Sequence, residues 1–243
     1  MSRVDEDGTG TATTGTSITH NLTISGVDRF TLVWQVLDAA GAGNEVQTIT
    51  YGGTTVYELG GDETAEVFTT DVNADSYDVF RFFDGDHPSN GATTVVVTAN
   101  LTQEMVGIAV QYDDAEQTDG FRDFAQSVEV SVAANPWDIT GIGEDGADQE
   151  TVGFFGTGHA SRVQASDADN PEIVSETIGG SGGTALTTVA VADTTSQATL
   201  GGDWSGTAPR TGVGWGASIM NAVSADLPRD LAHTPQHQAI MAR

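Results

Sequence analysis

The stretch A-T-T-V-V-V-T-A-N-L-T-Q-E-M-V-G-I-A-V-Q-Y, residues 92–112, decides the predicted fold. Residues 93–99 and 105–112 are rich in apolar and β-branched side chains, and the more polar segment 100–104 lies between them. Val95, Val96 and Val97 form a continuous apolar run, which is typical of a strand covered on both faces. We therefore expect a β-hairpin here, at the centre of a β-sandwich.

The second half of this stretch alternates as a strand does. The larger side chains of residues 105–112 share one face, namely Val106, Ile108, Val110 and Tyr112. This period of two distinguishes a strand from a helix. Two other segments show the same alternation on faces formed by Phe30, Leu32, Trp34 and Val36, and by Val213, Trp215, Ala217 and Ile219. Gly214 and Gly216 fall on the opposite face, where they predict close packing or a β-bulge.

The 243 residues are enough for one large all-β domain, and no cysteine is present to staple it. We predict an antiparallel two-sheet jelly-roll sandwich over residues 17–223, with tight Gly-rich turns such as Gly52-Gly53. Residues 1–16 are mostly Gly, Thr and acid, so we expect a flexible N-terminal arm held by a neighbouring subunit. Residues 224–243 form a C-terminal tail, in which Thr234 and Pro235 could begin a short helix.

Charge is the strongest compositional signal. The chain has 35 acidic and 8 basic residues, giving a net charge of −27, and all the basic residues are Arg. Such self-repulsion is tolerated best in concentrated salt, where the Debye length falls to about 3 Å at 1 M. We therefore expect a halophilic source; a mesophilic acidic protein is the alternative.

The same charge pattern disfavours two classes of partner. Nucleic acid and anionic membranes both call for a basic stripe or patch, whereas the arginines here are scattered singly. No run of 18 apolar residues is present to span a bilayer, and the N-terminus lacks the apolar segment of a secretory signal. We expect neither nucleic acid nor a membrane as a direct partner.

Acidic loops raise the question of a metal. The pairs Asp84/Asp86 and Asp113/Asp114 are weak candidates for Ca²⁺, which prefers clustered oxygen ligands on loops. In a chain this acidic, neighbouring carboxylates also arise by chance, so a solvated loop is the simpler interpretation. No motif requires a cofactor, and Ca²⁺ is the metal that these acidic loops could bind.

No arrangement of residues indicates catalysis. The segment G-T-G-H-A-S, residues 156–161, lacks the G-x-S-x-G order of a nucleophile turn. His233 and His237 are four residues apart, but Pro235 between them argues against the regular helix that a shared metal would need. A glycosidase needs two carboxylates at a set separation, which this sequence cannot single out. We therefore predict that the chain is not an enzyme.

Two tryptophans lie in turn-rich contexts. Trp137 follows Asn135-Pro136, and Trp204 lies in G-G-D-W-S-G. Aromatic rings on loops can stack on sugars, so both are weak candidates for glycan binding; a position in the core or at a subunit interface is the simpler interpretation.

Four segments together resemble a known family. They are I-T-H-N-L-T-I-S-G-V-D-R-F-T-L-V-W (18–34), V-Q-T-I-T-Y-G-G-T-T-V-Y-E-L (46–59), G-A-T-T-V-V-V-T-A-N (91–100) and T-G-V-G-W-G-A-S-I (211–219). This pattern is similar to jelly-roll domains of prokaryotic surface proteins and of tailed-virus virion proteins. The turn Tyr51-Gly52-Gly53 is its most specific part. The resemblance implies a fold and hands over no catalytic residues.

The functional hypotheses follow from this resemblance. The first is a structural protein of a haloarchaeal tailed virus, in a capsid turret, decoration or tail complex, assembled in the host cytoplasm with identical subunits and other virion proteins. The second is a lectin-like module that binds host surface glycans. A secreted polysaccharide-active enzyme is a third, disfavoured by the missing signal and the missing catalytic arrangement.

Overall fold

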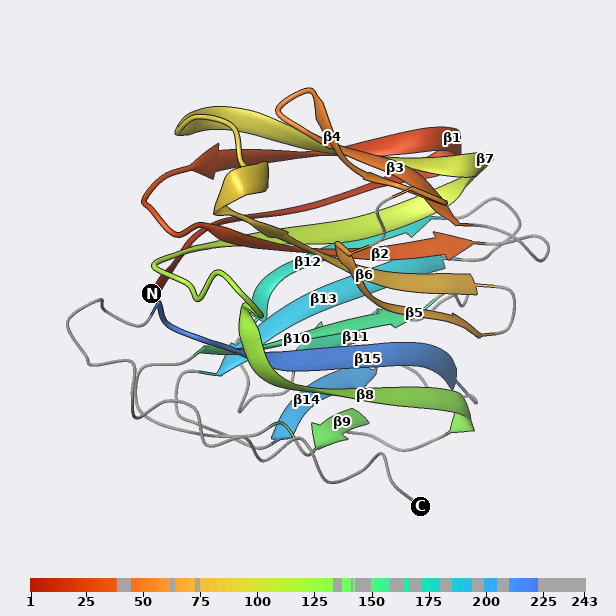
Figure 1. The fold of residues 1–243 in the computed structure, drawn as a ribbon. Coiled ribbons are helices and arrows are strands. Elements are labelled where there is room, and N and C mark those ends of the chain that lie inside the picture. The colour runs from red at the N-terminus through yellow and green to blue at the C-terminus, as the bar shows by residue number, and fades with distance from the viewer. Residues whose placement is uncertain are drawn as a thin grey trace, which may run out of the picture.

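The computed structural model shows an almost entirely β protein (Figure 1). The residues that it describes are 1–38, 45–61, 64–72, 75–132, 137–140, 142, 150–157, 164–166, 172–179, 185–193, 199–204 and 210–222. The predicted tail 224–243, with His233 and His237, lies outside the described residues, as does most of the segment 156–161.

The first sheet has seven strands in the order β4-β3-β7-β2-β6-β5, and β1 pairs with β7. Its strands are β1 (Ser2–Ile24), β2 (Phe30–Asp38), β3 (Val46–Tyr51), β4 (Thr54–Glu58), β5 (Glu66–Val72), β6 (Asp75–Phe83) and β7 (Gly91–Asp113). A short 3₁₀ helix, η1 (Asp84–Asp86), follows β6. All pairings in this sheet are antiparallel.

The predicted hairpin over residues 92–112 is wrong, because β7 is one strand of 23 residues. Its first half pairs with β3 and its second half with β2, while β1 follows its whole length. Asn100, Leu101 and Thr102 are exposed where the strand passes from one partner to the next, which explains why the polar segment resembles a turn. Val96 is only half-buried, so the valine run is covered more on one face than on the other.

The second sheet has five strands in the order β12-β13-β10-β15-β8, and the third has three in the order β11-β14-β9. Their strands are β8 (Phe121–Val132), β9 (Trp137–Thr140), β10 (Glu150–Thr157), β11 (Gln164–Ser166), β12 (Glu172–Gly179), β13 (Ala185–Asp193), β14 (Thr199–Trp204) and β15 (Arg210–Ile219). The all-β antiparallel sandwich is thus confirmed, whereas two sheets are expected and the described strands form three.

Strand β2 is covered on both faces, by the second sheet on one and by β3 and β4 on the other (Figure 1). Leu32 and Trp34 of β2 pack into a cluster with Phe154 and Trp215 of the second sheet. The alternate side chains, such as Val33, enter a second cluster with β3 and β4. A third cluster joins the second and third sheets through Ile139, Ile142, Phe155, Val191 and Leu200. Strand β2 is therefore central, which explains why eight of its nine residues are buried.

The predicted faces of alternating apolar residues are confirmed. The side chains expected to share a face lie in the cluster between the first and second sheets: Phe30, Leu32, Trp34, Val36, Val106, Ile108, Val110, Tyr112, Val213, Trp215, Ala217 and Ile219. An ideal Cβ on Gly216 would lie 2.8 Å from Ile142, and one on Gly214 would lie 3.1 Å from Ile139. The glycines of β15 therefore allow the close packing of the third sheet.

The predicted N-terminal arm is part of β1 and is held by its own chain. Residues 2–24 pair with β7 from Ser2↔Asp113 to Ile24↔Gly91. Carboxylates in the first half of β1 also bond the second half, because Asp7 accepts the N–H of Asn21 at 2.7 Å and Asp5 accepts that of Thr23. These acids therefore cover backbone groups that an edge strand would otherwise expose.

Candidate functional site

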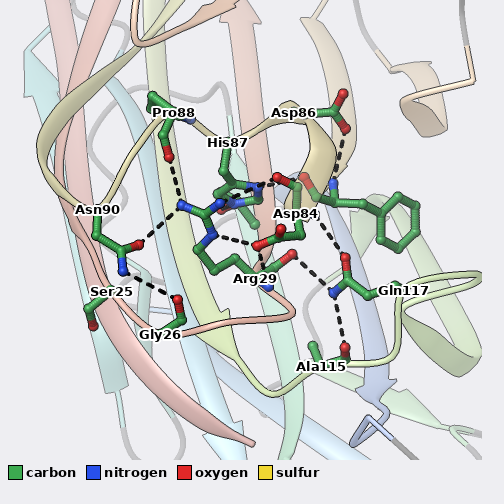
Figure 2. A network of polar contacts seen from close by, with 12 residues as sticks. Ser25, Gly26, Arg29, Asp84, Asp86, His87, Pro88, Asn90, Ala115 and Gln117 are labelled. Carbon is green, nitrogen blue, oxygen red and sulfur yellow. Dashed lines mark hydrogen bonds and ion pairs between the residues drawn. The ribbon is translucent and has the colours of Figure 1, made fainter.

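Two of the four segments that carry the family resemblance, 18–34 and 46–59, come together with the loop 84–90 at one end of the first sheet. Arg29 precedes β2, the turn Tyr51-Gly52-Gly53 joins β3 to β4, and the loop 84–90 joins β6 to β7. Figure 2 shows the polar network that connects Arg29 with the loop 84–90 and with Gln117. Residues far apart in the sequence are thus brought together here, and we describe this end of the sheet as the candidate site.

Arg29 is the centre of the network (Figure 2). Its Nε donates to Asp84 Oδ1 at 2.6 Å, and its Nη1 donates to the Pro88 carbonyl at 2.6 Å and to Asn90 Oδ1 at 3.1 Å. Gln117 bridges the base of the loop, since it accepts the Asp84 N–H and donates to the Arg29 carbonyl. The hydrogen bond from Arg29 lowers the pKa of Asp84, so this carboxylate stays ionised against its partner.

His87 belongs to the loop, and its buried side chain takes part in a chain of hydrogen bonds with Phe83, Thr31 and Tyr51. Its Nδ1 lies 2.6 Å from the Phe83 carbonyl, which can only accept, so Nδ1 carries the proton. Burial lowers the pKa of His87 to about 4, and the neutral ring therefore accepts through Nε2 from the Thr31 hydroxyl at 2.7 Å. Tyr51 in turn donates to Thr31 Oγ1 at 3.1 Å, because burial raises the pKa of Tyr51 to about 12 and keeps it protonated.

Two separate features of the structure require glycine in the Gly52-Gly53 turn. Both glycines have positive φ, 56° and 85°, as a tight hairpin turn requires. Gly52 also touches the loop, because an ideal Cβ there would lie 2.7 Å from Pro88 Cγ. The predicted turn is confirmed, and its first glycine allows the hairpin and the loop to approach closely.

A groove of about 510 Å³ lies between the β3–β4 hairpin and the loop. Its lining includes Thr55, Tyr57, Glu58, Asp86, His87 and Pro88. Glu58 and Asp86 are exposed carboxylates, whereas His87 is neutral and has both ring nitrogens bonded. The groove can therefore offer acceptors to a small polar molecule, but its histidine is held by structural bonds.

The structure gives the first pair of predicted Ca²⁺ candidates separate roles. Asp84 is paired with Arg29, and Asp86 accepts the N–H of Phe83 at 3.1 Å. A carboxylate that already neutralises a guanidinium is a poor ligand for a second cation. The two acids therefore hold the loop 84–90 to its surroundings.

The two residues of the second pair of predicted Ca²⁺ candidates, Asp113 and Asp114, also have different structural roles. The carboxylate of Asp113 accepts the N–H and the hydroxyl of Ser2 at 2.8 and 2.6 Å. Asp114 is exposed and turns the chain after β7 with a φ of 49°, a conformation that Asp tolerates better than most residues. Its main chain is fixed on both sides, since its N–H donates to the Val27 carbonyl at 2.9 Å and its carbonyl accepts the N–H of Ala222 at 2.7 Å.

The structure does not gather these four acids into a metal site. The described part of the chain contains no group of three or more Asp, Glu or His residues placed to hold a metal ion. Asp84 and Asp86 remain in the loop after β6, whereas Asp113 and Asp114 lie at the end of β7. Acids that are close in the sequence therefore do not form a shared set of metal ligands. Each carboxylate, or the main chain of its residue, contacts a different part of the fold.

The two candidate tryptophans lie on neighbouring strands of the third sheet. Trp137 of β9 lies opposite Gly202 of β14, and Trp204 lies two residues farther along β14. Their positions are therefore diagonal neighbours on the ladder. Nothing in the sequence predicts this register, because the two residues are far apart along the chain.

The structure also brings together three carboxyl groups that the sequence pattern does not predict to be close. Asp38 of β2 lies opposite Asp75 of β6, and the carboxyl groups of Asp38 and Glu104 are hydrogen-bonded. Burial, followed by the charge of Asp38, raises the pKa of Asp75 to about 8. With 35 acids in the chain, only the strand register singles these out.

No protein-family model, curated protein or solved structure matches the chain. Among the described residues, no helix is long and apolar enough to cross a membrane.

Proposed function

We propose that the chain is a structural, non-enzymatic component of a haloarchaeal tailed virus, in a capsid turret, decoration or tail complex. The resemblance to jelly-roll domains of virion proteins supports this role. The observation that carries it is the network at the candidate site, where Arg29, Asp84 and His87 bond to other parts of the fold. Side chains that fasten a loop in this way suit a rigid building part.

The charge of the chain supports a particle exposed to concentrated salt. The net charge is −27 and Lys is absent, so the surface is strongly anionic at neutral pH. Screening by salt allows such subunits to approach one another. Identical copies and other virion proteins are therefore the partners that we propose.

The test is the oligomeric state of the full chain in concentrated KCl, measured by light scattering and mass photometry. A structural role predicts a closed assembly, such as a trimer or a ring. The same measurement in dilute buffer is the control, because screening should favour the assembly. A monomer at every salt and protein concentration contradicts the proposal, as does turnover of a polysaccharide by the pure chain.

A lectin-like module that binds host surface glycans is the second candidate function. The register of β9 and β14 favours it, since Trp137 and Trp204 occupy diagonal positions on one ladder. A glycan array read in concentrated KCl tests it with Trp137→Ala and Trp204→Ala. Binding by the wild type that both variants weaken supports this function, and equal binding by all three chains contradicts a role for these tryptophans.

A further inference from the structure

An exposed aromatic ring stands out on the second sheet. Phe124 lies on β8, which is an edge strand of that sheet, and 52% of the residue is exposed. Among the residues whose burial the structure describes, the exposed large hydrophobic ones are Val27, Leu101 and Phe124, and Phe124 is the aromatic one.

A β-bulge places this ring. Phe124 lies opposite Ala217 of β15, and Phe121 lies opposite Ile219, so a step of three residues on β8 matches a step of two on β15. In a regular strand, residues three apart point to opposite faces. The bulge instead brings both phenylalanines to one face, with their ring centroids 5.9 Å apart. Bulges at sheet edges commonly re-aim a side chain in this way.

A stack of buried rings then holds Phe124 in a fixed orientation. Phe124 lies nearly parallel to Trp215, with centroids 6.3 Å apart and an interplanar angle of 19°. Trp215 stacks on Phe154, and Phe154 stacks on Trp34 at 5.9 Å and 7°. Trp215, Phe154 and Trp34 are completely buried. The exposed ring of Phe124 is therefore the outermost of four stacked aromatic rings. Because this stacking already fixes its orientation, a ligand that covers it costs little conformational entropy.

Three exposed residues close to Phe124 on its strand are polar. Arg122, Asp123 and Gln126 are all exposed, and Gln126 lies two residues away on the same face. A protein interface would need a larger apolar centre than this one ring. A pyranose needs one flat apolar surface for its C–H face and polar groups around it for its hydroxyls.

We propose that Phe124 is the stacking platform of a carbohydrate site that takes one pyranose residue of a glycan. The ring contacts the C–H face of the sugar, and Gln126, which shares the face of Phe124, lies where it can bond a hydroxyl of that sugar. This site is distinct from the Trp137 and Trp204 positions of the third sheet. It adds a binding function to the structural role and does not depend on that role.

The test uses the full chain in concentrated KCl and a glycan array of neutral and acidic oligosaccharides, followed by saturation-transfer NMR on the glycans that bind. Phe124→Leu keeps an apolar side chain but removes the flat ring, and it should weaken binding about tenfold or more. Phe124→Tyr keeps the ring and should bind like the wild type. Leu101→Ala is the matched control, because Leu101 is equally exposed at 52%.

Each result decides the proposal. Loss in Phe124→Leu with retention in Phe124→Tyr and Leu101→Ala supports it. The proposal is overturned if no glycan binds the wild type, or if Phe124→Leu binds equally well. It is also overturned if Phe124→Leu changes the oligomeric state and leaves glycan binding intact, which would make Phe124 a subunit contact. Loss confined to Trp137→Ala and Trp204→Ala would assign the glycan to the third sheet instead.

Discussion

Asp38 lies directly opposite Asp75 at the end of the ladder between β2 and β6, and both side chains are carboxyl groups. Asp75 is 7% exposed, and Asp38 is also hydrogen-bonded to the carboxyl group of Glu104. Two carboxyl groups can share a hydrogen bond only when one of them is protonated. Burial and the charge of Asp38 raise the pKa of Asp75 to about 8, so the fold retains a proton on Asp75 that the unfolded chain would release at neutral pH.

This proton uptake predicts that the free energy of unfolding falls as the pH rises. The pKa of Asp75 is raised from 3.8 to about 8 by burial and by Asp38, and the pKa of Asp38 is also raised. The native state thus binds more protons than the unfolded state between roughly pH 4 and pH 8, so stability falls by up to about 1.4 kcal/mol per pH unit for each such proton.

Asp75→Asn should raise the melting temperature at pH 8 and flatten its dependence on pH, because an amide mimics the protonated acid. Thermal unfolding in concentrated KCl, followed by circular dichroism from pH 5 to pH 9, measures both effects. Asp123→Asn is the control, since it removes one negative charge from an exposed position. Equal pH slopes for Asp75→Asn and the wild type would show that Asp75 is ionised in the native state.

The two glycines of the β3–β4 turn should differ in their tolerance of a side chain. Both have positive φ, so alanine at either position costs about 1 kcal/mol in backbone strain. An added Cβ at Gly52 would also lie 2.7 Å from Pro88, whereas nothing lies within 4 Å of one at Gly53. Gly52→Ala should therefore lower the free energy of unfolding by about 2 kcal/mol or more, and Gly53→Ala by about half of that.

Thermal unfolding of the two variants under identical conditions makes this comparison. Hydrogen exchange adds a local measurement, because Gly52→Ala should also increase exchange in the loop 84–90. Equal losses in the two variants would mean that the contact with Pro88 does not matter.

How much the sequence predicts depends on whether a residue acts locally or through the sheet register. The alternation in β2 and β15 predicts their buried faces, since period two is a local property. The hairpin predicted within β7 is wrong, because Asn100 and its polar neighbours are compatible with a turn as well as with an exposed segment of a long strand. It predicts the turn at Gly52 but not the contact with Pro88, and it cannot join Asp38 to Asp75, because those pairs form only across strands.

Gly107 and Gln35 should show strong energetic coupling. Gly107 lies opposite Gln35 on the β2–β7 ladder, and an added Cβ there would clash with the Gln35 amide. That amide lies 3.1 Å from Nε2 of His20, which is buried. Burial lowers the pKa of His20 to about 4, so Nδ1–H donates to the Asp7 carbonyl and Nε2 accepts from Gln35.

Gly107→Ala should displace the Gln35 side chain, leave the His20 acceptor without its donor and destabilise the fold by about 2–4 kcal/mol. The double variant Gly107→Ala/Gln35→Ala should cost less than the sum of its single variants, because the shortened side chain makes room for the new methyl group. A double-mutant cycle from thermal unfolding measures this coupling. Additive losses would indicate that the two residues act independently.

Salt should stabilise this protein strongly. The net charge is −27, with 35 acidic residues against 8 arginines, and Arg3 and Arg29 form ion pairs with Glu6, Glu150 and Asp84. Eight arginines are too few to neutralise 35 acids, so the mutual repulsion of the acids must be screened by ions, over a Debye length of about 10 Å at 0.1 M and about 3 Å at 1 M. The melting temperature should rise steeply with KCl up to about 1 M, where screening is nearly complete. Sucrose is the control, because it favours compact states without screening charge. A melting temperature that stays constant below about 0.5 M KCl would show that the acidic surface needs no screening.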